Sequence, residues 1–333
     1  MYRLLTLLSL AAILPGCTPH CTEVSANDVT DPMPKSDSVA IKHLAAPPPP
    51  RTANNQPDYF FAIAQYNTVY YGNSLENLAK LNIESAQLGI SPDGKSIAYS
   101  SYDRPGHRVI KLIDIESKNQ RVLDIPLTNV YMGSWNNAGK YIALNSQSTI
   151  YSHWQPVLFN VETNNITNID WLDPDTDYYN PMFSPDGHKL VFHDIRRIYI
   201  CNFRKGHAEL ERVIDTEDLC LDDNAGFSDY CKFQMSSDCK FLVFTIETDI
   251  FEEDICPIVA LCCYNLQSGH LKRLTNKHST VSDFALDSAG EIYFCTADKD
   301  RNIYEGYVAR LDDALPIKSA TFKEKTYAIS VAE

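Results

Sequence analysis

Nucleophile motifs are the first feature through which this chain could carry chemistry. A serine hydrolase of the α/β class holds its serine in a G-x-S-x-G turn, which exposes the hydroxyl at the end of a strand. Residues 89–93 (GISPD) and 226–230 (GFSDY) come closest to this motif, and both lack its last glycine. We therefore do not expect serine hydrolase activity.

The spacing of histidines decides whether a zinc ion could be held. The nine histidines form no H-E-x-x-H motif, and no two of them have zinc spacing on one element. His188 and His193 stand five positions apart, so a strand would place them on opposite faces. We expect surface histidines; a lyase that gathers scattered histidine ligands is the alternative.

An acidic loop is the other candidate metal site. Asp173, Asp175 and Asp177 alternate like the first ligands of a calcium loop. Such a loop continues with glycine at its sixth position and an acidic ligand at its twelfth, where this chain has Tyr178 and Ser184. We expect a plain acidic loop, with calcium binding as the weaker alternative, and we expect no cofactor.

Ten cysteines are a third source of chemistry, and eight of them lie from Cys201 to Cys295. In an oxidising compartment such a set favours disulfides. Cys220 and Cys231 bracket one loop and are the best-spaced pair, whose closure would stabilise the fold by about 2–3 kcal/mol. The alternative is that most are buried thiols acting as small apolar side chains. No C-x-x-C motif is present, so a redox enzyme is not expected.

The elements that position these residues are indicated by a repeated turn. Residues 91–94 and 184–187 both read SPDG, and apolar residues then alternate as in a strand. Serine can hydrogen-bond the turn backbone, proline presets φ, and glycine accepts the left-handed conformation. Weaker copies stand at residues 136–139 (NNAG), 236–239 (SSDC) and 287–290 (DSAG). Cys239 replaces the glycine, so we expect that turn to be distorted or Cys239 to be engaged.

The spacing of the turns indicates a β-propeller. Successive turns are 45 to 52 residues apart, the length of one four-stranded blade. Residues 58–63, 68–71 and 78–81 look like three strands of a further blade, and residues 327–331 look like its missing first strand. We therefore predict an all-β, six-bladed propeller over residues 57–333, closed by the C-terminal strand joining the N-terminal blade. Closure removes exposed sheet edges.

The repeat also resembles a known family. SPDG followed by a strand of the form K-x-I-A-Y, together with residues 298–304 (DKDRNIY), is similar to the repeats of TolB-like propellers. This resemblance covers residues 57–333 and implies the fold. TolB itself carries an α/β domain before its propeller and works with a peptidoglycan-associated lipoprotein in the Tol–Pal envelope system. The resemblance therefore implies an envelope partner, although similar repeats occur in dipeptidyl-peptidase-like propellers and some polysaccharide lyases.

Residues 1–16 have the pattern of an export signal. Arg3 precedes an apolar run over residues 4–14, which is too short to span a bilayer. One expected outcome of such a signal is a lipoprotein precursor. The alternative is ordinary cleavage after residue 26, which would give a soluble periplasmic or secreted protein.

A lipid anchor is indicated at the end of this signal. Residues 14–17 (LPGC) resemble the lipobox of bacterial lipoproteins, with Pro15 as a departure from the usual pattern. The resemblance implies cleavage before Cys17 and acylation of that cysteine, and Thr18 implies an outer-membrane lipoprotein facing the periplasm. Residues 17–56 are rich in proline and polar residues without a structural period, so we predict a disordered tether.

The net charge of the chain limits the classes of partner that it could bind. With 43 acidic and 29 basic residues the formal net charge is −14, and no run of lysine or arginine is present. A nucleic-acid-binding protein normally carries such a basic stripe. No nucleic acid partner is therefore expected.

The residues that line the channel of the propeller can be predicted from the turns. The first strand of each blade lines the channel, and the position four residues before each turn holds Gln87, Met132, Asn180, Lys232 and Asp283. Tyr131 and Tyr179, one position earlier, are predicted at the channel mouth. We expect these residues to bind a partner, and joint substitution of Lys232 and Asp283 to abolish its capture. The alternative is that they are polar because the channel holds water.

Two functions are compatible with these features. The first is a non-catalytic, membrane-anchored exported propeller, monomeric, that binds an envelope protein or peptide. The alternative is a small propeller enzyme or glycan-binding protein, similar to a polysaccharide lyase, with polar groups at one channel mouth.

Overall fold

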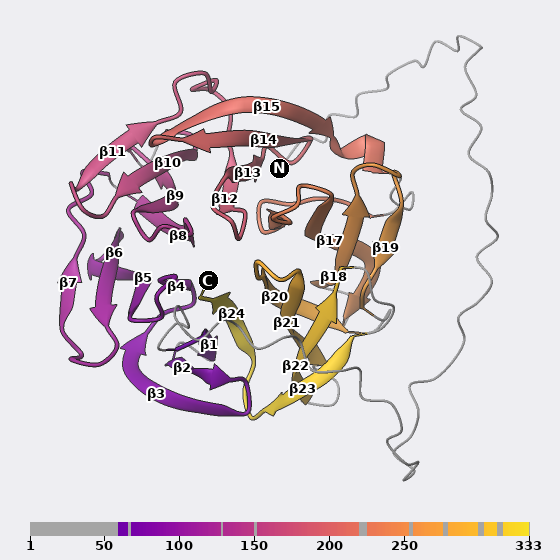
Figure 1. Cartoon of the computed structure of the whole chain (residues 1–333), viewed down its shortest axis with the longest axis horizontal. Coiled ribbons are helices and arrows are strands. Elements are labelled where there is room, and N and C mark those ends of the chain that lie inside the picture. The colour runs from indigo at the N-terminus through magenta and orange to yellow at the C-terminus, as the bar shows by residue number, and fades with distance from the viewer. Residues whose placement is uncertain are drawn as a thin grey trace, which may run out of the picture. The chain divides into compact units, whose positions relative to one another are not determined.

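The computed structural model describes residues 59–65, 68–127, 129–149, 152–219, 225–252, 256–275, 279–298, 303–311 and 316–332. In these residues the chain forms strands β1 to β24 and one short 3₁₀ helix, η1 (Thr216–Leu219). The strands form six four-stranded antiparallel sheets, arranged as the blades of a ring (Figure 1). The predicted all-β, six-bladed propeller is thereby confirmed.

The blades follow one another along the chain, and each runs from an innermost strand at the channel to an outermost strand at the rim. Blade I is β24 (Thr326–Val331), β1 (Phe61–Gln65), β2 (Thr68–Ser74) and β3 (Asn77–Glu84). Blade II is β4 (Leu88–Ile90), β5 (Ser96–Arg104), β6 (His107–Asp114) and β7 (Gln120–Val122). Blade III is β8 (Asn129–Trp135), β9 (Tyr141–Gln147), β10 (Gln155–Asn160) and β11 (Asn165–Asn168). Blade IV is β12 (Tyr179–Phe183), β13 (Lys189–His193), β14 (Arg197–Arg204) and β15 (His207–Asp215). Blade V is β16 (Phe233–Met235), β17 (Phe241–Glu252), β18 (Cys256–Asn265) and β19 (Leu271–Arg273). Blade VI is β20 (Thr280–Leu286), β21 (Glu291–Asp298), β22 (Ile303–Arg310) and β23 (Ile317–Phe322).

The ring is closed within blade I. The C-terminal strand β24 pairs antiparallel with β1, so that Phe61 lies opposite Val331 and Ile63 opposite Ile329. Figure 1 shows this closure as a yellow strand beside the indigo strands of the N-terminal blade. The predicted mode of closure is therefore confirmed, and it leaves no blade without its innermost strand.

Each SPDG turn is held together by its serine and aspartate. Ser91 Oγ lies 2.6 Å from Asp93 Oδ1 and accepts a hydrogen bond from the Ser96 N–H at 2.9 Å. Gly94 has a φ of +70°, and its N–H donates to the Ser91 carbonyl at 2.8 Å. The left-handed φ at the last position explains why glycine stands there.

The turn that contains Cys239 keeps the same geometry, contrary to the expectation that it is distorted or that the cysteine is engaged. Cys239 has a φ of +57°, and its N–H donates to the Ser236 carbonyl at 2.9 Å. Its side chain is an exposed, free thiol. Ser236 and Asp238 repeat the hydrogen bonds of Ser91 and Asp93, so the turn is held and Cys239 carries the backbone strain.

The hydrophobic core is divided among the blade interfaces, because each blade packs face to face on both neighbours. In β9, Ile142 and Leu144 are buried against blade II, and Ala143 is buried against blade IV. A strand that is covered on both faces reads as a continuous apolar run rather than as an alternation. The six buried clusters each combine residues of two adjacent blades.

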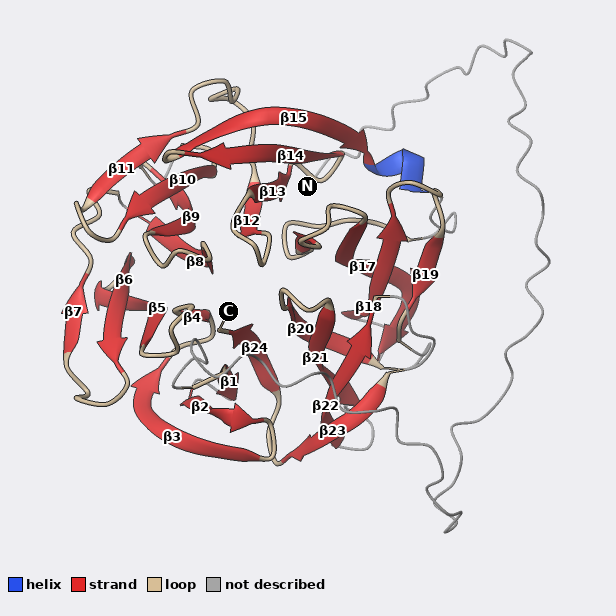
Figure 2. Cartoon of the chain, in the orientation of Figure 1, coloured by secondary structure: helices blue, strands red, loops and turns tan. Residues whose placement is uncertain are grey.

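Strands and loops make up nearly all of the ring (Figure 2). The helix η1 has four residues. Among the described residues, no helix has the length and apolarity that a membrane span requires.

Candidate functional site

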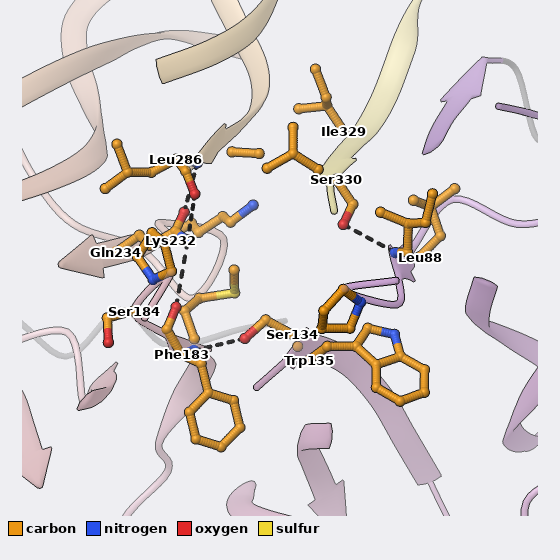
Figure 3. Close-up of a pocket in the computed structure, with 17 residues that line it drawn as sticks. Leu88, Ser134, Trp135, Phe183, Ser184, Lys232, Gln234, Leu286, Ile329 and Ser330 are labelled. Carbon is orange, nitrogen blue, oxygen red and sulfur yellow. Dashed lines mark hydrogen bonds between the residues drawn. The ribbon is translucent and has the colours of Figure 1, made fainter. Parts of the chain in front are cut away.

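The innermost strands of the six blades surround a narrow central channel. Side chains from β24, β4, β8, β12, β16 and β20 line a cavity there (Figure 3). Its free volume is about 60 Å³, whereas pockets for small ligands typically offer about 300–1,000 Å³. This cavity therefore has room for a few water molecules but not for a ligand of that size.

Hydrogen bonds between neighbouring blades encircle this cavity, and two of them use serine hydroxyls. The Ile90 N–H of blade II donates to Ser330 Oγ of blade I at 3.1 Å. The Phe183 N–H of blade IV donates to Ser134 Oγ of blade III at 2.7 Å (Figure 3). Each bond ties an innermost strand to the blade before it.

Two larger side chains continue this arrangement. The Trp135 indole N–H of blade III donates to the Gly89 carbonyl of blade II at 2.9 Å. Gln234 of blade V is buried, and its amide joins blades IV and VI. Its Nε2 donates to the Phe183 and Leu286 carbonyls, each at 3.4 Å, and its Oε1 accepts the Leu286 N–H at 3.1 Å.

Lys232 and Asp283 supply the side-chain hydrogen bonds between blades V and VI and between blades VI and I. Lys232 Nζ lies 3.0 Å from Asp283 Oδ1 and also donates to the Phe284 carbonyl. Asp283 Oδ2 accepts the Ile329 N–H of β24 at 2.9 Å. All six junctions are thus crossed by side-chain hydrogen bonds. The two residues join blades, so their joint substitution would weaken the ring as well as any binding.

Of the five residues predicted to line the channel, only Lys232 lines the cavity. Met132 is buried in the core between blades II and III. The register of β8 shifts between Met132 and Trp135, so later residues of the strand face the cavity. Gln87 is half-buried, and its Oε1 accepts a hydrogen bond from Ser100 Oγ at 3.1 Å. The binding roles of these residues stay predictions.

Sequence reasoning missed other residues that line the cavity and hydrogen-bond between neighbouring blades. Ser134 and Gln234 stand two positions before their turns, and Ser330 lies near the end of β24. Residues two apart in a strand share a face. Counting two as well as four positions back from each turn would have found the first two.

Two residues that the sequence singled out lie at the junction of blades IV and V, Asn180 half-buried and His193 fully buried. Asn180 Nδ2 donates to the carbonyls of Asp229 and Cys231 at 2.7 and 2.8 Å. His193 Nδ1 accepts the Ile195 N–H at 3.2 Å, so its Nε2 carries the proton and donates to the Cys231 carbonyl at 2.7 Å. Burial lowers the pKa of His193 to about 4. A surface position was expected for His193 and is wrong, because β13 is packed between two blades.

One face of the ring carries a cluster of aromatic side chains and an arginine. We define the top face as the one at which the innermost strands begin; the SPDG-type turns lie on the opposite, bottom face. Tyr131, at the start of β8, is on the top face, with its ring centroid 4.9 Å from that of Trp154. The guanidinium carbon of Arg108 lies 3.7 Å from the Tyr131 ring centroid and 5.0 Å from that of Tyr102. We call these four residues the top-face cluster.

Tyr179 extends the aromatic surface towards blade V. Its ring lies 5.6 Å from the His193 ring. Burial, followed by the charges of Asp177 and Asp229, raises the pKa of Tyr179, so its hydroxyl stays protonated. Tyr230, on the loop before β16, is 84% exposed.

Arg108, Trp154 and Tyr102 were missed because they lie near the loops between second and third strands. In a propeller these loops share the top face with the starts of the innermost strands. This rule, applied to the predicted blades, would have placed these three residues on the top face.

The acidic loop holds itself together. Asp173 Oδ1 accepts the Asp175 N–H at 3.0 Å, and Asp177 Oδ1 accepts the Trp154 N–H at 2.7 Å. Asp177 Oδ2 also lies 3.1 Å from His153 Nδ1. In the part of the chain that the structure describes, no three His, Cys, Asp or Glu side chains gather as a metal site. Asp173 therefore hydrogen-bonds within the loop and Asp177 joins the loop to residues 153 and 154, and calcium binding stays an untested alternative.

Several cysteines act as small apolar side chains. Cys201, Cys263 and Cys295 are buried thiols. Burial raises the pKa of Cys201 to about 12 and that of Cys263 to about 11, so both stay protonated. Cys231 is also buried. Its predicted partner Cys220 lies outside the described residues, and their pairing stays a prediction.

A wider groove lies at the seam where blades VI and I meet, between the β2–β3 hairpin and β23. Its volume is about 860 Å³. Tyr70, Leu78 and Phe322 supply apolar lining, and Glu76 and Lys318 supply charge. This groove has the size of a small-ligand pocket.

Comparison with solved structures agrees with this architecture. TolB from Acinetobacter baumannii matches with a TM-score of 0.59 and 14% sequence identity, over 82% of this chain and 66% of that one. A putative TolB from Agrobacterium tumefaciens matches with a TM-score of 0.53 and 11% identity, over 83% of this chain and 98% of that one. The chain has a TolB-like β-propeller fold.

The comparisons support the fold of this TolB-like propeller and do not extend to its function. The chain spans about two thirds of the length of the A. baumannii protein, and identities of 11–14% carry no function across. A periplasmic gluconolactonase from Pseudomonas aeruginosa is more distant, with a TM-score of 0.49 and 11% identity over 80% of each chain. No family profile and no curated protein matches the sequence.

Proposed function

We propose that this TolB-like propeller is an exported, membrane-anchored protein that binds an envelope protein or peptide through its top face, without catalysis of its own. The observation that carries the proposal is the top-face cluster. Tyrosine, tryptophan and arginine are the residue types that dominate the energetics of protein interfaces. Here they gather on the face at which the innermost strands begin, so we expect a partner to bind on that surface.

The location of the protein is part of the proposal. The export signal over residues 1–16, the acylation site Cys17 and the tether over residues 17–56 all lie outside the described residues. Two or three acyl chains on Cys17 would form a stable anchor where one would not. Membrane fractionation of the wild type and Cys17→Ser tests this part: the anchor predicts that the variant leaves the membrane fraction, and unchanged partition contradicts it.

The partner can be sought with a photo-reactive amino acid placed on each face. Position 230 on the top face is compared with position 163 on the bottom face, where Thr163 is exposed. We expect an identified envelope protein to cross-link at position 230 and not at position 163, and to bind the purified propeller when both are mixed. Equal cross-linking at both positions, or no binding by the purified pair, contradicts the proposal.

A second candidate function is supported by the seam groove. Its volume of about 860 Å³ and its aromatic lining by Tyr70 and Phe322 suit a saccharide, as in a glycan-binding or lyase-like propeller. Titration with a panel of polysaccharides, with turnover followed by formation of new reducing ends, tests it. Binding or turnover that Tyr70→Ala and Phe322→Ala remove would favour this function over the first.

A further inference from the structure

We infer that the top-face cluster recognises a carboxylate of the partner, either an acidic side chain or a free peptide C-terminus, and that Arg108 is the group that binds it. The inference rests on the proposed function, and it names the chemistry of the ligand at that site.

Arg108 is held in position by two aromatic rings. Its guanidinium carbon lies 3.7 Å from the Tyr131 ring centroid and 5.0 Å from that of Tyr102, and Nη2 donates to the Tyr102 hydroxyl. Stacking on a ring covers the face of the guanidinium, and the N–H groups at its edges that do not bind Tyr102 are left for a ligand. Those edges match the two oxygens of a carboxylate. A side chain fixed in this way loses little entropy when it binds.

No carboxylate among the described residues pairs with Arg108, although the chain has 43 acidic and 29 basic residues. By contrast, Arg197 Nη2 lies 2.9 Å from Asp194 Oδ2, and Arg310 Nη2 lies 3.2 Å from Glu291 Oε1. The nearest acid in sequence, Asp103, is engaged with His107 at 2.6 Å. Arg108 is therefore a positioned cation whose natural counter-ion is left to a ligand.

Further donors lie beside this cation. The Trp154 indole N–H and the Tyr131 hydroxyl make no hydrogen bond to the described residues, and both side chains are half-buried. Trp154 is fixed through its backbone, since its N–H donates to Asp177 Oδ1 at 2.7 Å and its carbonyl accepts the Tyr178 N–H at 2.9 Å. A carboxylate can accept several hydrogen bonds at once. The donors and the aromatic walls together fit a carboxylate next to an apolar group.

The test uses synthetic peptides that differ in one carboxylate. The probes are acetyl-Gly-Ser-Glu-Leu-Ser-amide, the same peptide with Gln for Glu, and the Gln peptide with a free C-terminus. Binding to the ¹⁵N-labelled full-length protein is followed at the Trp154 indole N–H, assigned with Trp154→Phe among the three tryptophans. We expect saturable shifts with one or both carboxylate peptides, and at least tenfold weaker binding of the neutral amide.

Three variants of the cluster separate charge from geometry. Arg108→Gln should remove the preference for carboxylates, and Arg108→Lys should retain the charge but weaken binding several-fold, because it lacks the planar fork. Tyr102→Phe keeps the ring and should change affinity less than either. Equal binding of neutral and acidic peptides, or a preference that survives in Arg108→Gln, overturns the inference. So does tighter binding of a neutral oligosaccharide at Trp154.

Failure of the inference is distinguishable from failure of the proposed function. If Arg108→Gln binds the identified envelope partner as the wild type does, while the joint variant Tyr131→Ala and Trp154→Ala does not, the carboxylate is wrong and the top-face function stands. If neither variant changes partner binding, the proposed function itself is wrong.

Discussion

At the scale of single residues, the polar side chains around the channel are committed to the fold. Asp283 was predicted from the sequence as a ligand-binding group, and Gln234 was not singled out, but both bind neighbouring blades through their side-chain hydrogen bonds. The partners of Gln234 lie about 50 residues away along the chain. Such pairings depend on the geometry of the closed ring, so the sequence alone did not reveal them.

Substitution of Gln234 measures how much this network stabilises the ring. Gln234→Ala removes the amide that serves two junctions and leaves the buried Leu286 N–H without its acceptor. We expect the free energy of unfolding to fall by about 2–4 kcal/mol, from the unsatisfied group and the cavity. Urea denaturation measures it, with the exposed pair variant Lys140→Ser and Glu162→Ser as control. A loss no larger than that of the control contradicts this role.

Substitution of Cys239 by glycine is expected to raise the free energy of unfolding. A non-glycine residue in the left-handed region costs about 1–2 kcal/mol, and Cys239 has a φ of +57°. Cys239→Gly should therefore raise the free energy of unfolding by about 0.5–1 kcal/mol, since part of the gain is lost to the greater freedom of unfolded glycine. Cys239→Ala is the matched control and should bring no gain. Equal stability of the two variants would show that the turn is not strained.

His193 makes stability depend on pH. Its pKa is about 4 in the folded protein and 6.5 as the ordinary value, so the unfolded chain takes up the proton first as the pH falls. The free energy of unfolding should therefore decrease between pH 6.5 and pH 4, by about 3 kcal/mol from this residue. Denaturation at pH 7 and pH 4 measures the loss for the wild type and His193→Gln. Equal losses in the two proteins would rule out the contribution of His193.

At the scale of elements, the sequence predicted which strands exist better than where they end. Residues 68–71 and 78–81 were predicted as strands, whereas β2 runs over Thr68–Ser74 and β3 over Asn77–Glu84. Most of the missing residues are polar or glycine, so no hydrophobic alternation marks them. The pairing of β2 with β3 nevertheless extends beyond the apolar residues, with Ser74 opposite Asn77 and Thr68 opposite Glu84. The register shift within β8 likewise leaves no mark in the sequence. For this reason Met132 was predicted to line the channel, whereas it is buried in the core.

The packing of blade III on blade IV depends on one glycine. A Cβ atom on Gly133 would lie 2.2 Å from the Pro181 carbonyl oxygen and 2.6 Å from that of Ala143. Both contacts are with backbone, so Gly133→Ala should separate the blades and lower the free energy of unfolding by about 2 kcal/mol or more. Gly226→Ala is the control, because a Cβ there meets nothing within 4 Å. Similar denaturation midpoints for both variants would contradict this account of the interface.

At the scale of the whole molecule, the spacing of five turns predicted the propeller, and the strand patterns of residues 58–81 and 327–331 predicted its sixth blade and its closure. The functional site was harder to predict from the sequence. Tyr131 and Tyr179 were predicted at the channel mouth from strand position alone. Arg108, near the start of β6, and Trp154, just before β10, belong to two blades whose contact depends on the folded ring. The identity of the partner is not encoded in the fold, since the pattern that builds blades says nothing of what the top face binds.

The most direct test of the account is the dissociation constant of the purified propeller with its cross-linked envelope partner, measured by calorimetry for three proteins. These are the wild type, the top-face variant Tyr131→Ala with Trp154→Ala, and the bottom-face variant Lys140→Ser with Glu162→Ser. We predict that the top-face variant binds at least tenfold more weakly, a loss of about 1.4 kcal/mol or more, and that the bottom-face variant binds as the wild type does. Equal affinity of the wild type and the top-face variant would contradict the central claim.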